Sequence, residues 1–306
     1  MSSSTGPAPG LPVRMPRPRQ SGRHRRPEPV AAPEGAPALV LAVPGAPTPT
    51  TRSLAEEVIS IARSELPGLE VGIGYLDGDG TEYPTLETVL AHTAGLRTER
   101  YEIAKAAGRE VAEPEGPAAV VVPLLAGPDN ALMRRVRQAV MDSRAAAELT
   151  DVLGPHPLLA EAVHVRLSEA GLARADRARL FTVATAADGI ILATVGGDEA
   201  VQAAGITGML LAARLAVPVM AAALDEPGSV SAIAEQLRGS GSVQLALAPY
   251  LVGPELPEGL LDAAAKEAGC AAAEALGAYP AIGKLVLSQY TTALGIAPQP
   301  QGAQPR

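Results

Sequence analysis

Aromatic side chains are almost absent from this sequence. Only 2% of its 306 residues are Phe, Trp or Tyr; there is no Trp, and Phe181 is the single Phe. This argues against nucleic-acid modules that stack bases on aromatic platforms. The hydrophobic fraction is nevertheless 47%, so the cores have to be packed from Ala, Val, Leu and Ile. That choice favours buried parallel strands covered by alanine-rich helices.

Cysteine is nearly missing as well. The single Cys270 excludes an internal disulfide and any cluster of cysteine metal ligands. It lies in an alanine-rich stretch, and we interpret it as a small buried residue. A chain without disulfides suits a reducing compartment, so we expect a cytoplasmic protein.

An uninterrupted apolar run long enough to span a membrane is also lacking. The longest candidate, residues 205–224, contains Arg214 and Pro218. It is better interpreted as a buried helix, a break at Pro218 and a strand. The N-terminus has no apolar stretch that could form the core of a secretion signal. We therefore expect neither a membrane span nor export.

Charge is distributed unevenly along the chain. Residues 1–37 contain six arginines and two glutamates, which give a local charge of +4. Because the whole chain has a net charge of −8, the remaining residues carry a net charge of −12. An acidic body is not expected to bind nucleic acid. The Pro-, Ser-, Gly- and Arg-rich residues 1–37 predict a disordered basic arm, and residues 297–306 a disordered tail. The arm is interpreted as solubilising, with weak contact to an acidic surface or nucleic acid as the alternative.

What the sequence does contain is an internal duplication. The apolar run 38–43 (ALVLAV), followed by a Pro-Gly break and a helix over about 53–65, matches 190–195 (IILATV), followed by Gly-Gly and a helix from about 199. Residues 71–77 (VGIGYLD) match 219–225 (VMAAALD). Residues 122–129 (VPLLAGPD) match 248–255 (APYLVGPE), and 153–157 (LGPHP) match 276–280 (LGAYP). Four blocks in the same order indicate a duplicated domain rather than a solenoid.

Strands that alternate with helices predict an α/β fold with a parallel sheet flanked by helices in each lobe. We place the lobes at residues 38–170 and 171–296. Ligands of such folds bind beyond the carboxyl ends of the strands. The loops starting at Pro44, Asp77, Gly127, Gly196, Asp225 and Gly253 are therefore the candidate site.

These motifs resemble the long, two-lobed sirohydrochlorin chelatases, which are class II tetrapyrrole chelatases. The resemblance covers about residues 38–295. It rests on Val122-Pro123-Leu124, on the Leu-Gly-Pro-His-Pro-Leu-Leu block at 153–159 and on Ala-Pro-Tyr-Leu at 248–251. Two family motifs have diverged: Gly-His-Gly-Ser/Thr is Val43-Pro44-Gly45-Ala46 here, and Glu with Pro-Ser-Leu is Asp77 with Pro84-Thr85-Leu86.

The resemblance implies insertion of Co²⁺ or Fe²⁺ into sirohydrochlorin in cobalamin or sirohaem biosynthesis, with the metal as substrate and no permanently bound cofactor. In the family, two histidines bind the metal and help remove pyrrole protons, because neutral imidazole is both ligand and base. The matching positions here are Pro44, which can do neither, and Asp129. Their second-lobe counterparts are Val195 and Glu255. Asp129 and Asp77 remain as metal ligands, and Pro44, Gly45, Asp77, Gly127, Asp129 and Gly196 as the ligand-binding cleft.

Several other residues allow two interpretations. His92 and His164 are expected on helix surfaces, and His156 in a turn that it stabilises rather than in a site. Asp77, Asp79 and Glu82 could gather a hard cation, although Asp-Gly-Asp-Gly is also ordinary turn chemistry. Gly45 and Gly196-Gly197 could hold an anion at a helix N-terminus, with tight turns as the plainer explanation. Arg134, Arg135 and Arg137 could bind tetrapyrrole carboxylates or form a solvated face.

Three functions stay open on the sequence alone. The chain is a chelatase, or an inactive homologue that binds a tetrapyrrole, a metal or a protein partner in the cleft between the lobes, or a purely structural partner protein. Whether it is an enzyme at all is not decided by the residues, since both catalytic histidines are replaced. Two lobes in one chain are compatible with a monomer or a homodimer.

Overall fold

The computed structural model describes residues 31–33, 35–173 and 187–295. The arm and tail expected at residues 1–37 and 297–306 lie almost wholly outside these ranges. Along the chain, the first half contains β1 (Ala38–Val43), α1 (Pro49–Glu65), β2 (Val71–Tyr75), α2 (Leu86–Ala106), β3 (Ala119–Pro123), α3 (Asn130–Asp142), β4 (Ala147–Leu149) and α4 (Pro157–Glu169). The second half contains β5 (Gly189–Thr194), α5 (Asp198–Leu215), β6 (Val219–Ala223), α6 (Ser229–Gly239), β7 (Leu245–Pro249), α7 (Leu260–Ala268), β8 (Ala271–Ala272) and α8 (Pro280–Ala293).

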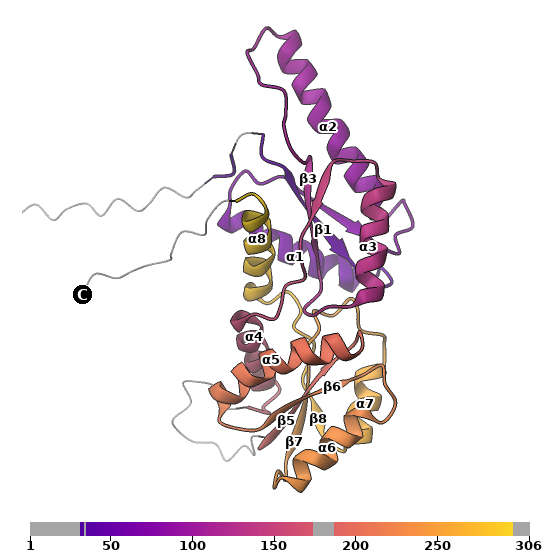
Figure 1. Cartoon of the computed structure of the whole chain (residues 1–306), viewed down its shortest axis with the longest axis vertical. Helices are drawn as coiled ribbons and strands as arrows, with labels where there is room; N and C mark the ends of the chain where they lie inside the picture. The colour runs from indigo at the N-terminus through magenta and orange to yellow at the C-terminus, as the bar shows by residue number, and fades with distance from the viewer. Residues whose placement is uncertain (1–30, 34, 174–186, 296–306) are drawn as a thin grey trace, which may run out of the picture.

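These strands form two parallel sheets of the same topology. The strand orders are β2-β1-β3-β4 in the first lobe and β6-β5-β7-β8 in the second. Corresponding strands keep the same register: Val43 of β1 pairs with Tyr75, and Thr194 of β5 pairs with Ala223. The predicted α/β class with two duplicated lobes, each a parallel sheet flanked by helices, is confirmed (Figure 1).

The strands are buried on both faces, as expected for continuous apolar strands of a parallel sheet that is covered by helices. Every residue of β1, β3, β5 and β7 is buried. The helices bury alanine together with larger aliphatic residues: α5, for example, buries Ala200, Ala203, Ala204 and Leu211. Small side chains let the helices approach the sheets closely, so a core with few aromatics can still be filled.

The last helix of each repeat crosses over to the other lobe. In Figure 1, α8 lies with the first lobe, whereas α4 lies with the second. Accordingly α8 packs on α1 and β3, while α4 packs on α5 and β7. The Tyr290 hydroxyl of α8 donates to the Pro37 carbonyl at 2.6 Å, and Arg166 Nε of α4 donates to the Leu276 carbonyl at 3.1 Å. The predicted boundary at residue 170 divides the chain by sequence, but each half in space contains a helix from the other repeat.

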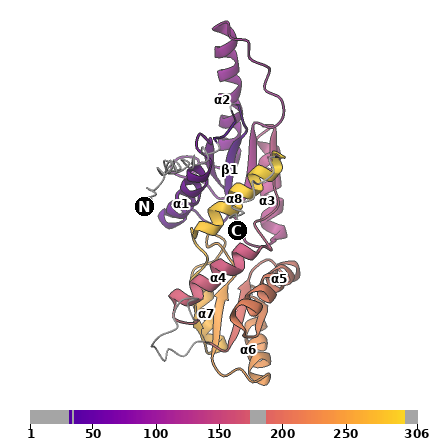
Figure 2. The same ribbon diagram turned by 90° about the vertical axis from the view of Figure 1, so that its left-hand side faces the viewer.

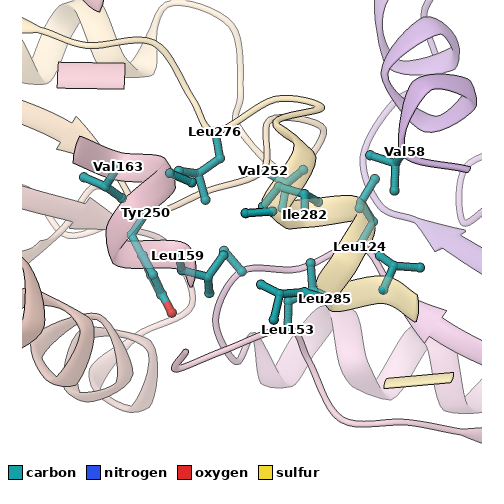
Figure 3. Close-up of a cluster of buried hydrophobic side chains, with 14 of the residues drawn as sticks. Val58, Leu124, Leu153, Leu159, Val163, Tyr250, Val252, Leu276, Ile282 and Leu285 are labelled. Atoms are coloured by element: carbon teal, nitrogen blue, oxygen red, sulfur yellow. The ribbon is translucent and has the colours of Figure 1, made fainter. Parts of the chain in front are cut away.

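A continuous apolar core joins the lobes at this crossover. It contains strand residues of both sheets, such as Leu39 and Leu192. Figure 3 shows the part near α4 and α8, with Val58, Leu124, Leu153, Leu159, Val163, Tyr250, Val252, Leu276, Ile282 and Leu285 labelled. Tyr250 is fully buried there, and its hydroxyl accepts a hydrogen bond from Thr207 Oγ1 at 3.1 Å. Burial raises the pKa of Tyr250 to about 12, so it stays neutral.

Within the described ranges, no helix has the length and apolar character needed to cross a lipid bilayer. The run at residues 205–224 is divided as predicted: α5 ends at Leu215, Pro218 follows, and β6 begins at Val219.

Candidate functional site

The carboxyl ends of the two sheets face each other across the middle of the molecule. The loop after β1 touches the loop after β7, because a Cβ built on Gly45 would lie 2.0 Å from the Pro254 carbonyl oxygen. The loop after β5 touches the loop after β3, because a Cβ on Gly196 would lie 2.8 Å from the Pro128 carbonyl oxygen. The duplication aligns Gly45 with Gly196 and Pro128 with Pro254, so the two contacts are equivalent. The lobes are therefore related by an internal pseudo-symmetry.

Gly45 and Gly196 are glycines for two reasons. Their φ angles of +78° and +112° fall where side chains are rarely tolerated. The opposite lobe also occupies the space that a Cβ would need. The sequence left two interpretations of these glycines, an anion site at a helix N-terminus and a tight turn. The structure has a tight turn at both positions. The Gly196 N–H donates to Asp225 Oδ2 at 3.0 Å, so this amide already serves a carboxylate of its own lobe.

Pro44 and Gly127 also lie at this inter-lobe contact. Pro44 is buried directly after β1. A Cβ on Gly127 would lie 3.2 Å from the Tyr250 ring. Thus the predicted cleft residues at the ends of β1, β3 and β5 meet where the lobes touch.

Asp129 forms the N-cap of α3. Its Oδ1 accepts hydrogen bonds from the backbone N–H groups of Ala131 and Leu132 at 2.9 and 2.8 Å. A carboxylate in this position satisfies amides that the helix leaves unpaired and interacts favourably with the positive end of the helix dipole. This capping role was not among the sequence-based predictions for Asp129.

Asp77 pairs with an arginine of the same lobe. Arg135 Nη2 contacts Asp77 Oδ1, and Arg135 Nη1 lies 3.4 Å from Asp77 Oδ2. Arg134, Arg135 and Arg137 are all exposed on α3, consistent with a solvated face. Of the three arginines, Arg135 forms this ion pair with Asp77, which joins α3 to the end of β2.

Glu255 is buried at the inter-lobe contact, although the sequence analysis assigned it no role beyond being the counterpart of Asp129. It corresponds to Asp129 in the second lobe, yet it is only 9% exposed. Its oxygens accept from the Val252 and Gly253 N–H groups at 2.7 and 2.9 Å. Burial raises the pKa of Glu255 to about 6 against the lowering effect of its backbone hydrogen bonds, and the negative charge of Asp129 contributes a small part of that rise. The duplication was the signal that could have pointed to this pair.

Among the residues that the structure describes, no three His, Cys, Asp or Glu side chains lie together so that they could hold a metal ion. Asp79 Oδ1 accepts from the Thr81 and Tyr83 N–H groups at 2.9 Å each, which is the turn chemistry considered above. Asp129 and Asp77 as metal ligands remain a prediction.

The histidines also serve the fold. His156 caps α4 by accepting from the Leu158 N–H at 3.1 Å, and burial lowers its pKa. This is the structural role expected for it. His92 is exposed on α2 as predicted. The surface prediction for His164 is wrong: it is 4% exposed, because α4 packs on α5, where Arg214 Nε donates to His164 Nδ1 at 2.8 Å. His24 lies outside the described residues.

Two hollows lie away from the inter-lobe contact. A crevice of about 1140 Å³ is lined by Ala38, Glu70 and Ala118, and so opens at the amino ends of the first sheet's strands. A pocket of about 310 Å³ lies beside Asp225, between α6 and α7. Neither contains Pro44, Gly45 or Asp129, so neither coincides with the predicted cleft, although the second is lined by the start of the Asp225 loop, one of the six candidate loops.

The fold and the facing strand ends define a two-lobed α/β protein with exchanged terminal helices. A similar solved structure is the sirohydrochlorin chelatase SirB from Bacillus subtilis subspecies spizizenii in complex with cobalt. The two agree with a TM-score of 0.55 at 14% sequence identity, over 85% of this chain and 96% of that one. This similarity shows a chelatase-like fold.

A second solved structure, a periplasmic ribose ABC transporter from Conexibacter woesei, matches with a TM-score of 0.29 at 15% identity, over 89% of this chain and 72% of that one. That score is too low to indicate a shared fold. No protein-family model matches the chain. No curated protein sequence matches it either.

Proposed function

We propose that this protein binds a sirohydrochlorin-like tetrapyrrole between its lobes and does not itself insert the metal ion. The similarity to a sirohydrochlorin chelatase over 85% of the chain carries the proposal. The sequence resemblance over residues 38–295 supports the same ligand class. Parallel α/β folds bind ligands beyond the carboxyl ends of their strands, which here face each other. A tetrapyrrole-binding role fits the cytoplasmic location expected from the single cysteine.

Metal insertion is disfavoured by the chemistry of the strand-end residues. Pro44 stands where the family has a metal-binding histidine, and its side chain can neither coordinate a metal nor accept a proton. The Asp77 carboxylate is engaged by Arg135. The Asp129 carboxylate is engaged by the N-terminus of α3. Each predicted ligand therefore has a structural partner that a metal ion would have to displace.

Cationic side chains near these loops can recognise the acidic substituents of the tetrapyrrole. Arg134 and Arg137 are exposed on α3, five and eight residues after its capping residue Asp129. Arginine guanidinium groups bind carboxylates through two parallel hydrogen bonds. These two residues are the recognition groups of the proposal.

The observed contacts also mean that the lobes part when the ligand binds. The Gly45 and Pro254 backbones touch, so a planar macrocycle cannot pass between them in this arrangement. Hinge opening about the segments that lead into α4 and α8 is the simplest motion that makes room. Binding should therefore change the overall dimensions of the molecule.

A second candidate, insertion of Co²⁺ or Fe²⁺, is favoured by one observation. Glu255 has a pKa raised to about 6 by burial, and Asp129 is close enough for its charge to contribute. A carboxylate that titrates near neutrality is better matched to accepting a pyrrole proton than an ordinary one. This candidate assigns Glu255 as base and Asp129 as metal ligand.

The deciding experiment is an anaerobic titration of the full chain with sirohydrochlorin, followed by Co²⁺, monitored by visible absorption and small-angle scattering. We expect a spectral shift and an increased radius of gyration, with metallation no faster than without protein. Arg134→Glu combined with Arg137→Glu should weaken binding at least about tenfold, which corresponds to about 1.4 kcal/mol. Arg63→Glu, an exposed charge at the far end of α1, is the matched control.

Each other outcome has a definite meaning. Accelerated metallation that is lost in Asp129→Ala or Glu255→Gln would replace the binding proposal with the insertion candidate. No spectral shift at any protein concentration would refute both. Binding that is equally strong in the double arginine variant would refute the recognition groups while leaving the ligand class intact.

A further inference from the structure

A small pocket lies at the carboxyl end of β6, between α6 and α7. Its volume is about 310 Å³, and we call it the β6 pocket. Figure 2 shows α6 and α7 together in the second lobe. The floor of the pocket is apolar, because Leu224, Val230 and Ala264 line it and are buried. Pockets of this size, with apolar walls and a few polar groups, are typical binding sites for small molecules.

The polar groups of the β6 pocket are all acidic. Asp225, Glu226 and Glu267 line it, and each is exposed. The basic residues of α6 and α7 are Arg238 and Lys266, and neither lines the pocket. Within the part of the chain that the structure describes, none of the three carboxylates forms an ion pair. The pocket therefore combines concentrated negative charge with an apolar floor.

The duplication shows what the first lobe places at the corresponding position. Asp77 and Asp225 match in the two repeats, and each lies two residues beyond the end of its strand. The Asp77 carboxylate is paired with Arg135 of α3. Helix α7 is the counterpart of α3, because each follows the third strand of its lobe along the chain. It contains no arginine, and it turns Leu260 and Ala263 to the pocket. The second lobe thus keeps the carboxylate and lacks the guanidinium.

We propose that the β6 pocket binds a small organic cation of the alkylguanidinium class, which takes the place that an arginine side chain has in the first lobe. The guanidinium group pairs with Asp225 through parallel hydrogen bonds, and its alkyl chain lies on Leu224 and Val230. Asp225 Oδ2 also accepts the Gly196 N–H at 3.0 Å, which is compatible with the cation because a carboxylate accepts several hydrogen bonds. The proposal does not depend on whether the lobes bind a tetrapyrrole between them.

Isothermal titration calorimetry of the full chain with n-butylguanidinium tests the proposal, with the uncharged n-butylurea as the matched compound. We expect n-butylguanidinium to bind at one site per chain, at least about tenfold more tightly than n-butylurea, because it alone pairs with a carboxylate. Asp225→Asn should weaken this binding at least about tenfold, while its amide oxygen can still accept the Gly196 N–H. Asp262→Asn is the matched control, since Asp262 is an exposed carboxylate of α7 outside the pocket lining.

Ala263→Arg tests the comparison with the first lobe. It adds a guanidinium to α7 at an exposed position that lines the pocket, so we expect it to occupy the site and to abolish saturable binding of n-butylguanidinium. Far-UV circular dichroism and melting temperature verify that the variants fold. Equal binding of the two compounds, or an affinity unchanged in Asp225→Asn or Ala263→Arg, would overturn the proposal. An equal loss in Asp262→Asn would also overturn it, because the attraction would then come from the general negative charge of the surface.

Discussion

At the scale of single residues, the carboxylates at the strand ends differ in what holds them. Asp77 is paired with a guanidinium, Asp129 with helix amides, and Asp225 with the Gly196 amide. Glu255 is buried and held by two amides of its own loop. Burial opposes ionisation because the charged form loses its hydration. Glu255 is therefore the carboxylate in this group whose ionisation opposes folding.

The Glu255 side chain should make the protein less stable as the pH rises. Its pKa is raised from 4.5 to about 6 in the folded state, so the folded chain binds this proton more tightly than the unfolded chain. The stabilisation is fully present below about pH 4.5 and is lost as the pH rises through about 6, a difference of about 2 kcal/mol. Urea unfolding at pH 4.5 and 7 measures it.

Glu255→Gln provides the reference for that measurement, because its amide does not ionise. Relative to wild type, it should gain about 2 kcal/mol of unfolding free energy between the two pH values. His156, whose pKa is lowered by burial, acts in the opposite direction, but it is present in both proteins and cancels in the difference. A wild-type-to-variant difference that is independent of pH would contradict the assignment.

At the scale of elements, α8 packs closely on α1 at Gly283. A Cβ on Gly283 would lie 2.5 Å from Ile61 Cβ and Cγ2 and 3.1 Å from the Val58 carbonyl oxygen. The glycine lets the helix axes approach, so that Ile282 and Leu285 on either side of it enter the core shown in Figure 3. Close approach of the backbones thus substitutes for the bulky aromatics that the sequence lacks.

Gly283→Ala should lower the unfolding free energy by about 1–3 kcal/mol, because the added methyl group meets Ile61 in a packed contact. Gly95→Ala on α2 is the matched control, since nothing lies within 4 Å of a Cβ there. That control should raise stability by about 0.4–1 kcal/mol, the usual gain for alanine over glycine in a helix. Equal effects of the two substitutions in urea unfolding would show that α8 tolerates displacement from α1.

At the scale of the whole molecule, the exchanged helices make the lobes mutually dependent. Without α8, the first lobe exposes the apolar face of α1 and β3, and without α4 the second exposes that of α5 and β7. The core is continuous across the crossover, so neither repeat contains the whole of its own core. Hinge motion of the lobes is compatible with this arrangement, but independent folding of the two repeats is not.

Cutting the chain into residues 1–173 and 174–306 tests this dependence. Each half alone should bind a hydrophobic dye and unfold without a cooperative transition, since its terminal helix has lost its partner surface. Mixing the halves should restore cooperative unfolding and suppress dye binding. Urea unfolding of residues 1–173 alone can be monitored by far-UV circular dichroism. A sharp transition would show that the first repeat folds without the second.

The sequence predicted the features of the fold that depend on neighbouring residues, and it missed those that depend on tertiary packing. The first three strands of each repeat, their parallel arrangement and the equivalence of the repeats were predicted from the four repeated blocks, because hydrophobic pattern and turn residues are local signals. The short edge strands β4 and β8 lie outside those blocks and were not predicted. The roles of Asp129 and His156 as helix caps were accessible in principle, since both precede a helix start. The burial of His164 was not, because it depends on α4 packing against the lobe that follows it.

The sequence by itself determined a duplicated α/β fold with cores packed from aliphatic residues, and its resemblance to the chelatases predicted that Pro44 and Asp129 stand at the positions of their histidines. Only the tertiary structure decided that Gly45 touches Pro254, that Glu255 is buried near Asp129 and that the terminal helices are exchanged. The physical reason is the range of the interactions. Periodicity and turn chemistry act over a few neighbouring residues, whereas burial and close backbone contact join residues that lie more than a hundred positions apart.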